Sequence, residues 1–279
     1  MSNINGIRGH MKSIQQTVKI SNAQKLIAGS KINKAHKVFE KSQAYHNRIK
    51  TSVSCVLKDC EVKSKYVDTG EKIKKHGLLV ISADKGLAGA YSQNLIKTVH
   101  QLMEEETIVK IMAAGLLGHK NFHEEIVDDF TCIVENPTLA TAEEIAEHMI
   151  KMYENGIVDC FDVIYTHFKS ALHMVPVIER LFPLPINDIP VVHFAEYDPS
   201  PDIVLQRLVP KYVKGFIFGC LTQAWICELS SRVSAMENAI KNGNEMLNKL
   251  SLQYNRVRQG DITREITEIV ASASAMEEA

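Results

Sequence analysis

Residues 229–257, LSSRVSAMENAIKNGNEMLNKLSLQYNRV, carry the spacing of apolar residues that decides the fold. The spacing alternates between four and three residues through Leu229, Val233, Met236, Ile240, Gly243, Leu247, Leu250, Tyr254 and Val257. Such a heptad pattern, sustained over about four repeats, predicts a coiled-coil helix. The apolar positions then shift to Ile262, Ile266, Ile269 and Val270. We therefore expect the regular seam to end near Gly260 and the last turns to contact a different surface.

Proline is confined to the middle of the chain. All eight prolines lie between Pro137 and Pro210, so none interrupts a helix in the first 136 or the last 69 residues. The stretch from about Lys211 to Ser274 is predicted to form one helix, which at about 1.5 Å per residue spans roughly 95 Å. Ser200 and Pro201 suit the cap and the first residue of a helix returning from the middle.

The N-terminal segment has the matching pattern. The same alternation of three and four residues joins Ile4, Ile7, Met11, Ile14 and Val18. Helices from opposite ends of the chain are predicted to pair antiparallel, although a helical bundle is the alternative on pattern alone. The apolar stripe falters at Ser21 and Lys25 before it resumes at Ala28, which indicates either local unpairing or contact with a third surface.

Strands alternate with helices between the two terminal segments. The predicted order is strand Leu78–Ala83, helix Ala88–Glu106, strand Ile108–Ala113, helix Thr141–Glu154 and strand Phe161–Thr166. Thr141 with Glu144 has the spacing of a capping box. This alternation predicts a mainly parallel sheet. The fold class is thus α/β, with a long antiparallel coiled coil at residues 1–62 and 201–279 and a central Rossmann-like domain at 63–200.

Charge indicates an acidic partner. The net charge is -1, but residues 1–50 contain ten Lys and Arg residues and one acid, Glu40. A basic helix can bind nucleic acid, an anionic membrane or an acidic protein surface, and charge alone does not choose among them. No stretch approaches the roughly 20 apolar residues of a membrane span, and no signal peptide is evident, so we expect a cytosolic chain.

No motif of known catalytic chemistry is recognisable. Residues 86–89, GLAG, follow a strand and open a helix, but their spacing fits neither nucleotide-binding glycine motif. His119 and His123 are four residues apart beside Glu124, a spacing that a metal could use but that falls short of H-E-x-x-H. The six cysteines fit no zinc or redox spacing and are interpreted as reduced. We expect no catalytic residue, cofactor or metal; a nucleotide-dependent enzyme and a nucleic-acid-binding coiled coil are the competing hypotheses.

Three stretches carry a family resemblance. The opening helix contributes IR at 7–8, KSI at 12–14, Thr17, KI at 19–20 and AGSK at 28–31. The tail contributes SRVSAMENA at 231–239, YNR at 254–256, RQ at 258–259 and ITREITEIV at 262–270. The loop SADKGLAG at 82–89 lies between them. Together these stretches resemble the γ subunit of F-type ATP synthases, bacterial type.

The resemblance implies a non-catalytic rotor. In that family the paired helices form a central stalk inside a ring of α and β subunits, and its rotation couples ion flow to ATP synthesis or hydrolysis. It also implies contacts of the middle domain with the ε subunit and the membrane c-ring, a peripheral location on the cytoplasmic side of the cell membrane, and neither membrane insertion nor nucleic-acid binding.

The resemblance also assigns candidate residues. Subunit-interface or coupling roles are expected for Arg8, Gln24, Lys31, Arg232, Gln259, Thr263, Glu265 and Glu268, and a central-domain loop role for Asp84, Gly86 and Gly89. Among these, Arg232, Gln259 and Thr263 match positions that hydrogen-bond to β-subunit loops. The sequence departs from the family pattern at Gln24, Ala88, Ala90, Tyr91 and Arg264.

Overall fold

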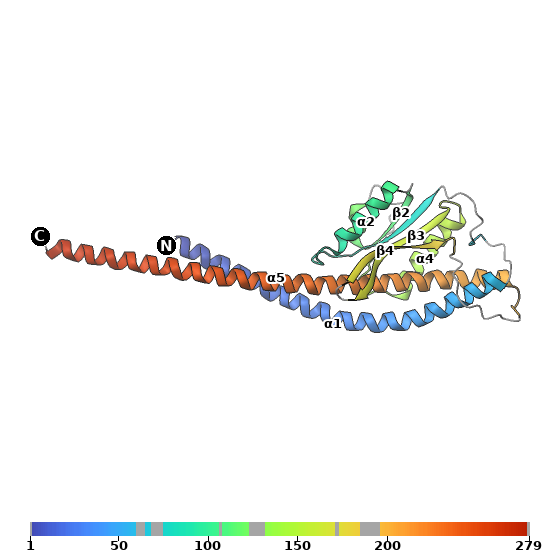
Figure 1. Ribbon diagram of the computed structural model, residues 1–279, viewed down its shortest axis with the longest axis horizontal. Helices are drawn as coiled ribbons and strands as arrows, with labels where there is room; N and C mark the ends of the chain where they lie inside the picture. The colour runs from blue at the N-terminus through green and yellow to red at the C-terminus, as the bar shows by residue number, and fades with distance from the viewer. Residues whose placement is uncertain are drawn as a thin grey trace. The chain divides into compact units, whose positions relative to one another are not determined.

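The chain forms two compact units that share two long helices. The computed structural model describes residues 2–59, 65–67, 75–105, 108–122, 132–170, 173–184 and 196–277. One unit comprises residues 1–28 and 233–279, and the other comprises residues 29–232. Helices α1 (Ser2–Asp59) and α5 (Pro201–Glu277) each contribute to both units (Figure 1). The expected division into residues 1–62, 63–200 and 201–279 separates the long helices from the middle of the chain and not these two units. It stays a prediction.

The first unit is an antiparallel helix pair. Along α5 the predicted seam positions from Val233 to Val257 are buried or half-buried, whereas most residues between them are exposed. Gly243 of α5 lies against Val18 of α1, and Lys25 Nζ lies 2.8 Å from a carboxylate oxygen of Glu237. Residue numbers therefore rise along α1 as they fall along α5, which confirms the predicted antiparallel coiled coil.

The interruption in the N-terminal stripe is part of this pairing. Ser21 is 6% exposed, so its small side chain occupies the seam itself. Lys25 forms its ion pair with Glu237, and Ala28 one turn later is 2% exposed. Of the two interpretations of the interruption, local unpairing is wrong, because a small residue and an interhelical ion pair continue the contact.

The second unit contains a four-stranded sheet. Its strands are β1 (His76–Ile81), β2 (Ile108–Ala114), β3 (Cys160–Ser170) and β4 (His173–Phe182), in the order β2-β1-β3-β4. β1 pairs in parallel with β2 and β3, and β4 pairs antiparallel with β3. Helices α2 (Tyr91–Glu105), α3 (Leu116–Asn121) and α4 (Leu139–Glu154) complete the α/β arrangement. The predicted mainly parallel sheet is confirmed, with an antiparallel edge strand added.

Alternation along β1 produces two apolar layers. Leu78 and Val80 pack in a cluster with residues of α2, whereas Leu79 and Ile81 pack in a cluster with residues of α4, α1 and α5. All six residues of β1 are buried, as a central strand covered on both faces requires. Figure 1 shows α2 and α5 on opposite sides of the sheet. The core thus holds the sheet against both long helices.

Several predicted boundaries differ from the observed ones. α4 begins at Leu139 because the Thr138 side chain caps it by accepting a hydrogen bond from Thr141 N, so the capping box at Thr141 is wrong. α5 begins at Pro201 as predicted and contains Pro210 within its third turn.

Five described cysteines are free and buried, and His123 and Glu124 of the suspected metal motif lie outside the described residues. None of the helices in the described segments combines the length and apolarity needed to cross a membrane.

Candidate coupling surface and the loop beside it

The loop after β1, residues 82–91, is held at its base by backbone and hydroxyl hydrogen bonds. Ser82 N donates to Ala114 O at 2.8 Å, and Ser82 Oγ accepts from Gly118 N at 2.7 Å. Gly115 has a φ of 95°, and a Cβ there would lie 2.7 Å from Ser82 O, so only glycine fits. The loop then turns through Leu87 (φ 64°) and the predicted site residue Gly89 (φ 58°).

Asp84, also a predicted site residue, organises the loops around it. Its Oδ2 accepts from Val134 N at 2.8 Å and from Glu135 N at 2.7 Å, and its Oδ1 accepts from Leu116 N at 3.3 Å. The residue is 8% exposed. A buried carboxylate is stable here because three backbone N–H groups compensate for its lost hydration. Asp84 therefore has a structural role that joins three segments of the domain.

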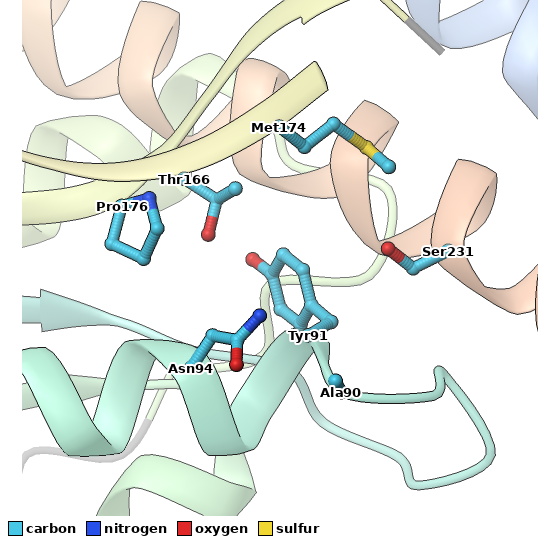
Figure 2. Close-up of a pocket in the computed structure, with 7 residues that line it drawn as sticks. All are labelled: Ala90, Tyr91, Asn94, Thr166, Met174, Pro176 and Ser231. Atoms are coloured by element: carbon cyan, nitrogen blue, oxygen red, sulfur yellow. The ribbon is translucent and has the colours of Figure 1, made fainter. Parts of the chain in front are cut away.

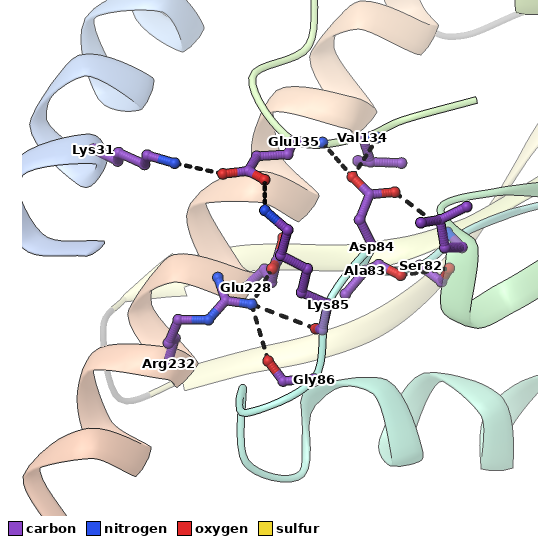
Figure 3. Close-up of polar contacts among 11 residues, drawn as sticks. Lys31, Ser82, Ala83, Asp84, Lys85, Gly86, Val134, Glu135, Glu228 and Arg232 are labelled. Atoms are coloured by element: carbon purple, nitrogen blue, oxygen red, sulfur yellow. Dashed lines mark hydrogen bonds and ion pairs between the residues drawn. The ribbon is translucent and has the colours of Figure 1, made fainter. Parts of the chain in front are cut away.

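Glu135 connects this loop to α1. One carboxylate oxygen forms an ion pair with Lys31 Nζ, and the other lies 2.6 Å from Lys85 Nζ. Hydrogen bonds from Lys31 and Lys85 lower the pKa of Glu135 to about 2. Figure 3 shows Glu135 between the two lysines. Neither Glu135 nor Lys85 was among the predicted site residues, because no local pattern places Glu135 beside residues 50 and 104 positions away.

Arg232 connects the same loop to α5. Its Nη2 lies 2.6 Å from Glu228 Oε1 and donates to the backbone carbonyl of Gly86 at 3.2 Å and to that of Lys85 at 3.4 Å (Figure 3). Burial raises the pKa of Glu228, which is 4% exposed, and Arg232 partly offsets this shift. The four-residue spacing from Glu228 to Arg232 is a signal that could have identified this pair from sequence.

The structure thus brings together four of the predicted residues: Lys31, Asp84, Gly86 and Arg232. They belong to the second unit, in which loop 82–91 contacts α5 directly and is linked to α1 through Glu135. The remaining candidates, except Gly89 in that loop, lie in the first unit.

In the first unit, Arg8, Gln259, Thr263, Glu265 and Glu268 are exposed, and Gln24 is half-buried. Thr263 Oγ1 donates to Gln259 O at 2.9 Å within α5, and Glu268 lies 3.8 Å from Arg264 Nε.

An apolar stripe continues along α5 beyond the seam. Ile262, Ile266, Ile269 and Val270 are 47, 56, 66 and 58% exposed. Their spacing of four, three and one residues places them along one side of a helix, and contiguous exposed apolar residues of this kind commonly mark an interaction surface. The expected contact of the last turns with another surface stays a prediction.

A small cavity lies next to the loop. Its volume is about 160 Å³, and its lining includes Tyr91, Asn94, Thr166 and Ser231 (Figure 2). Cofactor and drug sites usually measure about 300–1,000 Å³. Among the described residues that line this cavity none is a lysine or arginine, and the cavity is smaller than this range.

Taken together, the heptad-paired helices, the exposed tail stripe and a sheet domain tied to both helices define a class of protein: a coiled-coil shaft with an attached α/β domain. A family model described as ATP synthase matches residues 3–276. The ATP synthase gamma chain of Ruminiclostridium cellulolyticum is 37% identical over 99% of both chains, and that of Moorella thermoacetica is 36% identical over 99% of this chain and 100% of its own. The chain belongs to the ATP synthase gamma chain family.

Solved structures share the fold. A chain of the Euglena gracilis mitochondrial ATP synthase, in a structure of OSCP, F1 and c-ring, has a TM-score of 0.71 at 15% identity and covers 99% of this chain and 95% of its own. A chain from the central stalk and c-ring of the Tetrahymena thermophila mitochondrial enzyme has a TM-score of 0.62 at 22% identity, covering 79% and 99%. Gamma chains are non-catalytic subunits of ATP synthase, which agrees with the function predicted from sequence.

Proposed function

We propose that this chain is the rotating central-stalk subunit of an F-type ATP synthase and couples ion flow to ATP synthesis or hydrolysis in the catalytic ring. The observation that carries the proposal is the antiparallel shaft whose C-terminal extension presents an uncovered apolar stripe. A stiff helix pair transmits rotation, and a ring of subunits around the tail would bury the stripe. Similar chains occur in structures described as central stalk, c-ring and rotor.

The partners follow from the same reasoning. The α and β subunits would surround the tail, and the basic residues of α1 would face acidic surfaces of the β subunits, since opposite charge favours that encounter. The ε subunit and the c-ring would bind the α/β domain. Assembly with the c-ring would locate this chain at the cytoplasmic face of the cell membrane as a peripheral subunit.

The proposed coupling residues are distributed over both units. Gln259, Thr263, Glu265 and Glu268 lie on the exposed tail and are available to the ring, as is Arg8 on α1. Lys31 and Arg232 already form ion pairs within this chain, so a contact of either with a β subunit would have to share or replace these pairs.

Assembly is the direct test. Purified chain alone should hydrolyse ATP at the background rate, whereas mixing it with its own α and β subunits should give a complex that hydrolyses ATP and retains the chain through gel filtration. Changing Ile266 and Ile269 together to serine should weaken retention, while serine at the exposed seam-flanking Leu252 should not, because Leu252 lies outside the tail stripe. Failure to bind α and β, or salt-sensitive binding to DNA instead, would contradict the proposal.

A further inference from the structure

Loop 82–91 contacts α5 directly, and α1 through Glu135, at the place where both helices leave the second unit. Lys31 is the third residue of that unit on α1, and Arg232 is its last residue on α5. Both helices continue from there into the helix pair. Any twist that the pair carries has to pass this level before it reaches the α/β domain.

The contacts at this level are ion pairs and hydrogen bonds, and α5 has further polar contacts with the domain, such as those between Lys214 Nζ and Glu143 Oε1 at 2.9 Å and from Cys227 Sγ to Thr166 O at 3.4 Å. Elsewhere in the unit, α1 and α5 pack on the domain through apolar residues such as Val53 and Leu221. Apolar packing sets which face of a helix is buried, but the hydrophobic effect is non-directional and defines the rotation of the helix less sharply than a polar contact does. Ion pairs and hydrogen bonds have defined donors and acceptors, so the contact of Lys31 with Glu135 and that of Arg232 with the loop restrict the rotation of each helix against the domain.

Glu135 is the common element of these contacts. Its carboxylate bridges Lys31 and Lys85, and its backbone N–H donates to Asp84. The loop residue Lys85 in turn offers its carbonyl oxygen to Arg232. A continuous path therefore runs from α1 through Glu135 and the loop to α5, and we call it the Glu135 bridge. With its pKa near 2, Glu135 keeps its charge throughout the neutral range.

We propose that Glu135 is a positioning residue for energy coupling: the Glu135 bridge fixes α1 and α5 to the α/β domain so that rotation of the shaft and of the domain stay in step. This inference rests on the proposed rotor function. Loss of the bridge allows the helix pair, and with it the catalytic ring, to rotate further relative to the α/β domain. It therefore lowers ion transport for each ATP hydrolysed, while the catalytic sites, which lie in other subunits, continue to turn over.

The experiment uses complexes reconstituted in vesicles with the chain's own partner subunits. ATP hydrolysis and ATP-driven ion transport are measured in the same vesicles, and their ratio is the readout. Glu135→Gln should reduce transport per ATP by roughly twofold to fivefold, as expected for loss of a partly exposed pair of ion contacts. Glu147→Gln is the matched control, because Glu147 forms an exposed pair with Lys151 at 3.8 Å on α4, away from the bridge.

A double-mutant cycle separates the bridge from general destabilisation. Lys31→Gln removes the ion pair between α1 and Glu135 and leaves the Asp84 hydrogen bonds and Lys85 in place. The transport ratio of this variant therefore tests the bridge even if Glu135→Gln assembles poorly. The double variant should be no worse than the more affected single variant, because both changes break one path. Equal transport ratios in wild type and both single variants, or losses that multiply, would overturn the bridge and leave the rotor proposal intact. A wild-type chain that supports no ATP-driven transport would instead overturn the rotor proposal.

Discussion

Gly243 of α5 lies so close to Val18 of α1 that a Cβ at residue 243 would stand 2.5 Å from Val18 Cγ2 and 3.7 Å from Ile14 Cγ2. Real Cβ atoms do not approach a carbon this closely, so the helix pair requires glycine at this seam position. Val18 cannot easily turn away, because a β-branched side chain in a helix has one strongly preferred rotamer. The seam thus has a close backbone approach at a position that an ordinary heptad would fill with a large side chain.

Changing Gly243 to Ala should destabilise the helix pair although alanine is the better helix former. We expect a loss of about 1–3 kcal/mol from overpacking, against a propensity gain of about 1 kcal/mol. Urea unfolding followed by circular dichroism measures the difference. Gly260→Ala is the control, since nothing lies within 4 Å of a Cβ there, and it should stabilise. Adding Val18→Ala to Gly243→Ala should recover part of the loss; a Gly243→Ala variant more stable than wild type would disprove the close approach.

Replacing Asp84 by Asn should loosen the loops that it joins. The amide keeps one acceptor but presents N–H groups to the backbone donors of Val134, Glu135 or Leu116, which leaves a buried donor unpaired. We expect a loss of about 1–3 kcal/mol and faster amide hydrogen exchange at residues 134 and 135. Glu147→Gln, an exposed carboxylate on α4, should leave both unchanged. Unaltered exchange at these two amides in Asp84→Asn would show that the carboxylate does not hold them.

The buried pair of His76 and Asp162, with the exposed Arg180 beside it, should make stability depend on pH. His76 Nε2 lies 2.7 Å from Asp162 Oδ2, and Arg180 pairs with the same carboxylate. Burial alone lowers the pKa of His76, but the hydrogen bonds and charge interactions with Asp162 and Cys160 together outweigh it and raise the pKa from 6.5 to about 10. The stabilisation by protonated His76 is therefore complete below pH 6.5 and is lost as pH rises toward 10.

The carboxylate of Asp162 makes stability depend on pH in the acidic range, with the opposite sign. Burial raises the pKa of Asp162, yet the hydrogen bonds from His76 and Arg180 lower it overall, so its contribution is present above pH 3.8 and lost as pH falls through the lowered pKa. His76→Gln should cost about 1–3 kcal/mol at pH 6, because Arg180 still pairs with Asp162. The difference from wild type should shrink steadily up to about pH 9.5 in urea titrations. A difference that stays constant over this range would argue against a charged His76.

Replacing Gln259 and Thr263 together by Ala should lower coupled turnover and leave the free chain folded. Thr263 Oγ1 bonds only locally to Gln259 O in the described structure, so its removal changes little in the isolated helix, and alanine favours the helix. Removing each hydrogen bond to a β subunit would cost about 1 kcal/mol. Thr267→Ala is a close control, because Thr267 Oγ1 makes the same type of bond to Thr263 O at 2.8 Å. Ion transport by the reconstituted enzyme that equals wild type would assign these residues to the solvent-exposed surface.

Features set by local spacing were predictable from the sequence. The seam on either side of Gly243, its end near Gly260 and the start of α5 at Pro201 follow from apolar periodicity and backbone chemistry, which act within a few residues. Strand β4 was missed because Pro176 stands in the middle of its apolar residues 174–178, and a proline argues against a strand unless the strand lies at the edge of a sheet, as β4 does. The helix cap was predicted at Thr141 but is Thr138. Either threonine could cap a helix there, and the local sequence does not decide between them.

The polar contacts around the loop were decided only by the tertiary structure. Glu135 is 104 residues from Lys31, and Arg232 is 146 residues from Gly86. The sheet, the packed helices and the Asp84 hydrogen bonds bring these groups within contact distance. A carboxylate and an ammonium interact according to their separation in space, and the sequence carries no measure of that separation. The sequence therefore determined the shaft and its family, whereas only the folded chain determined that its two helices are tied to the domain through Glu135.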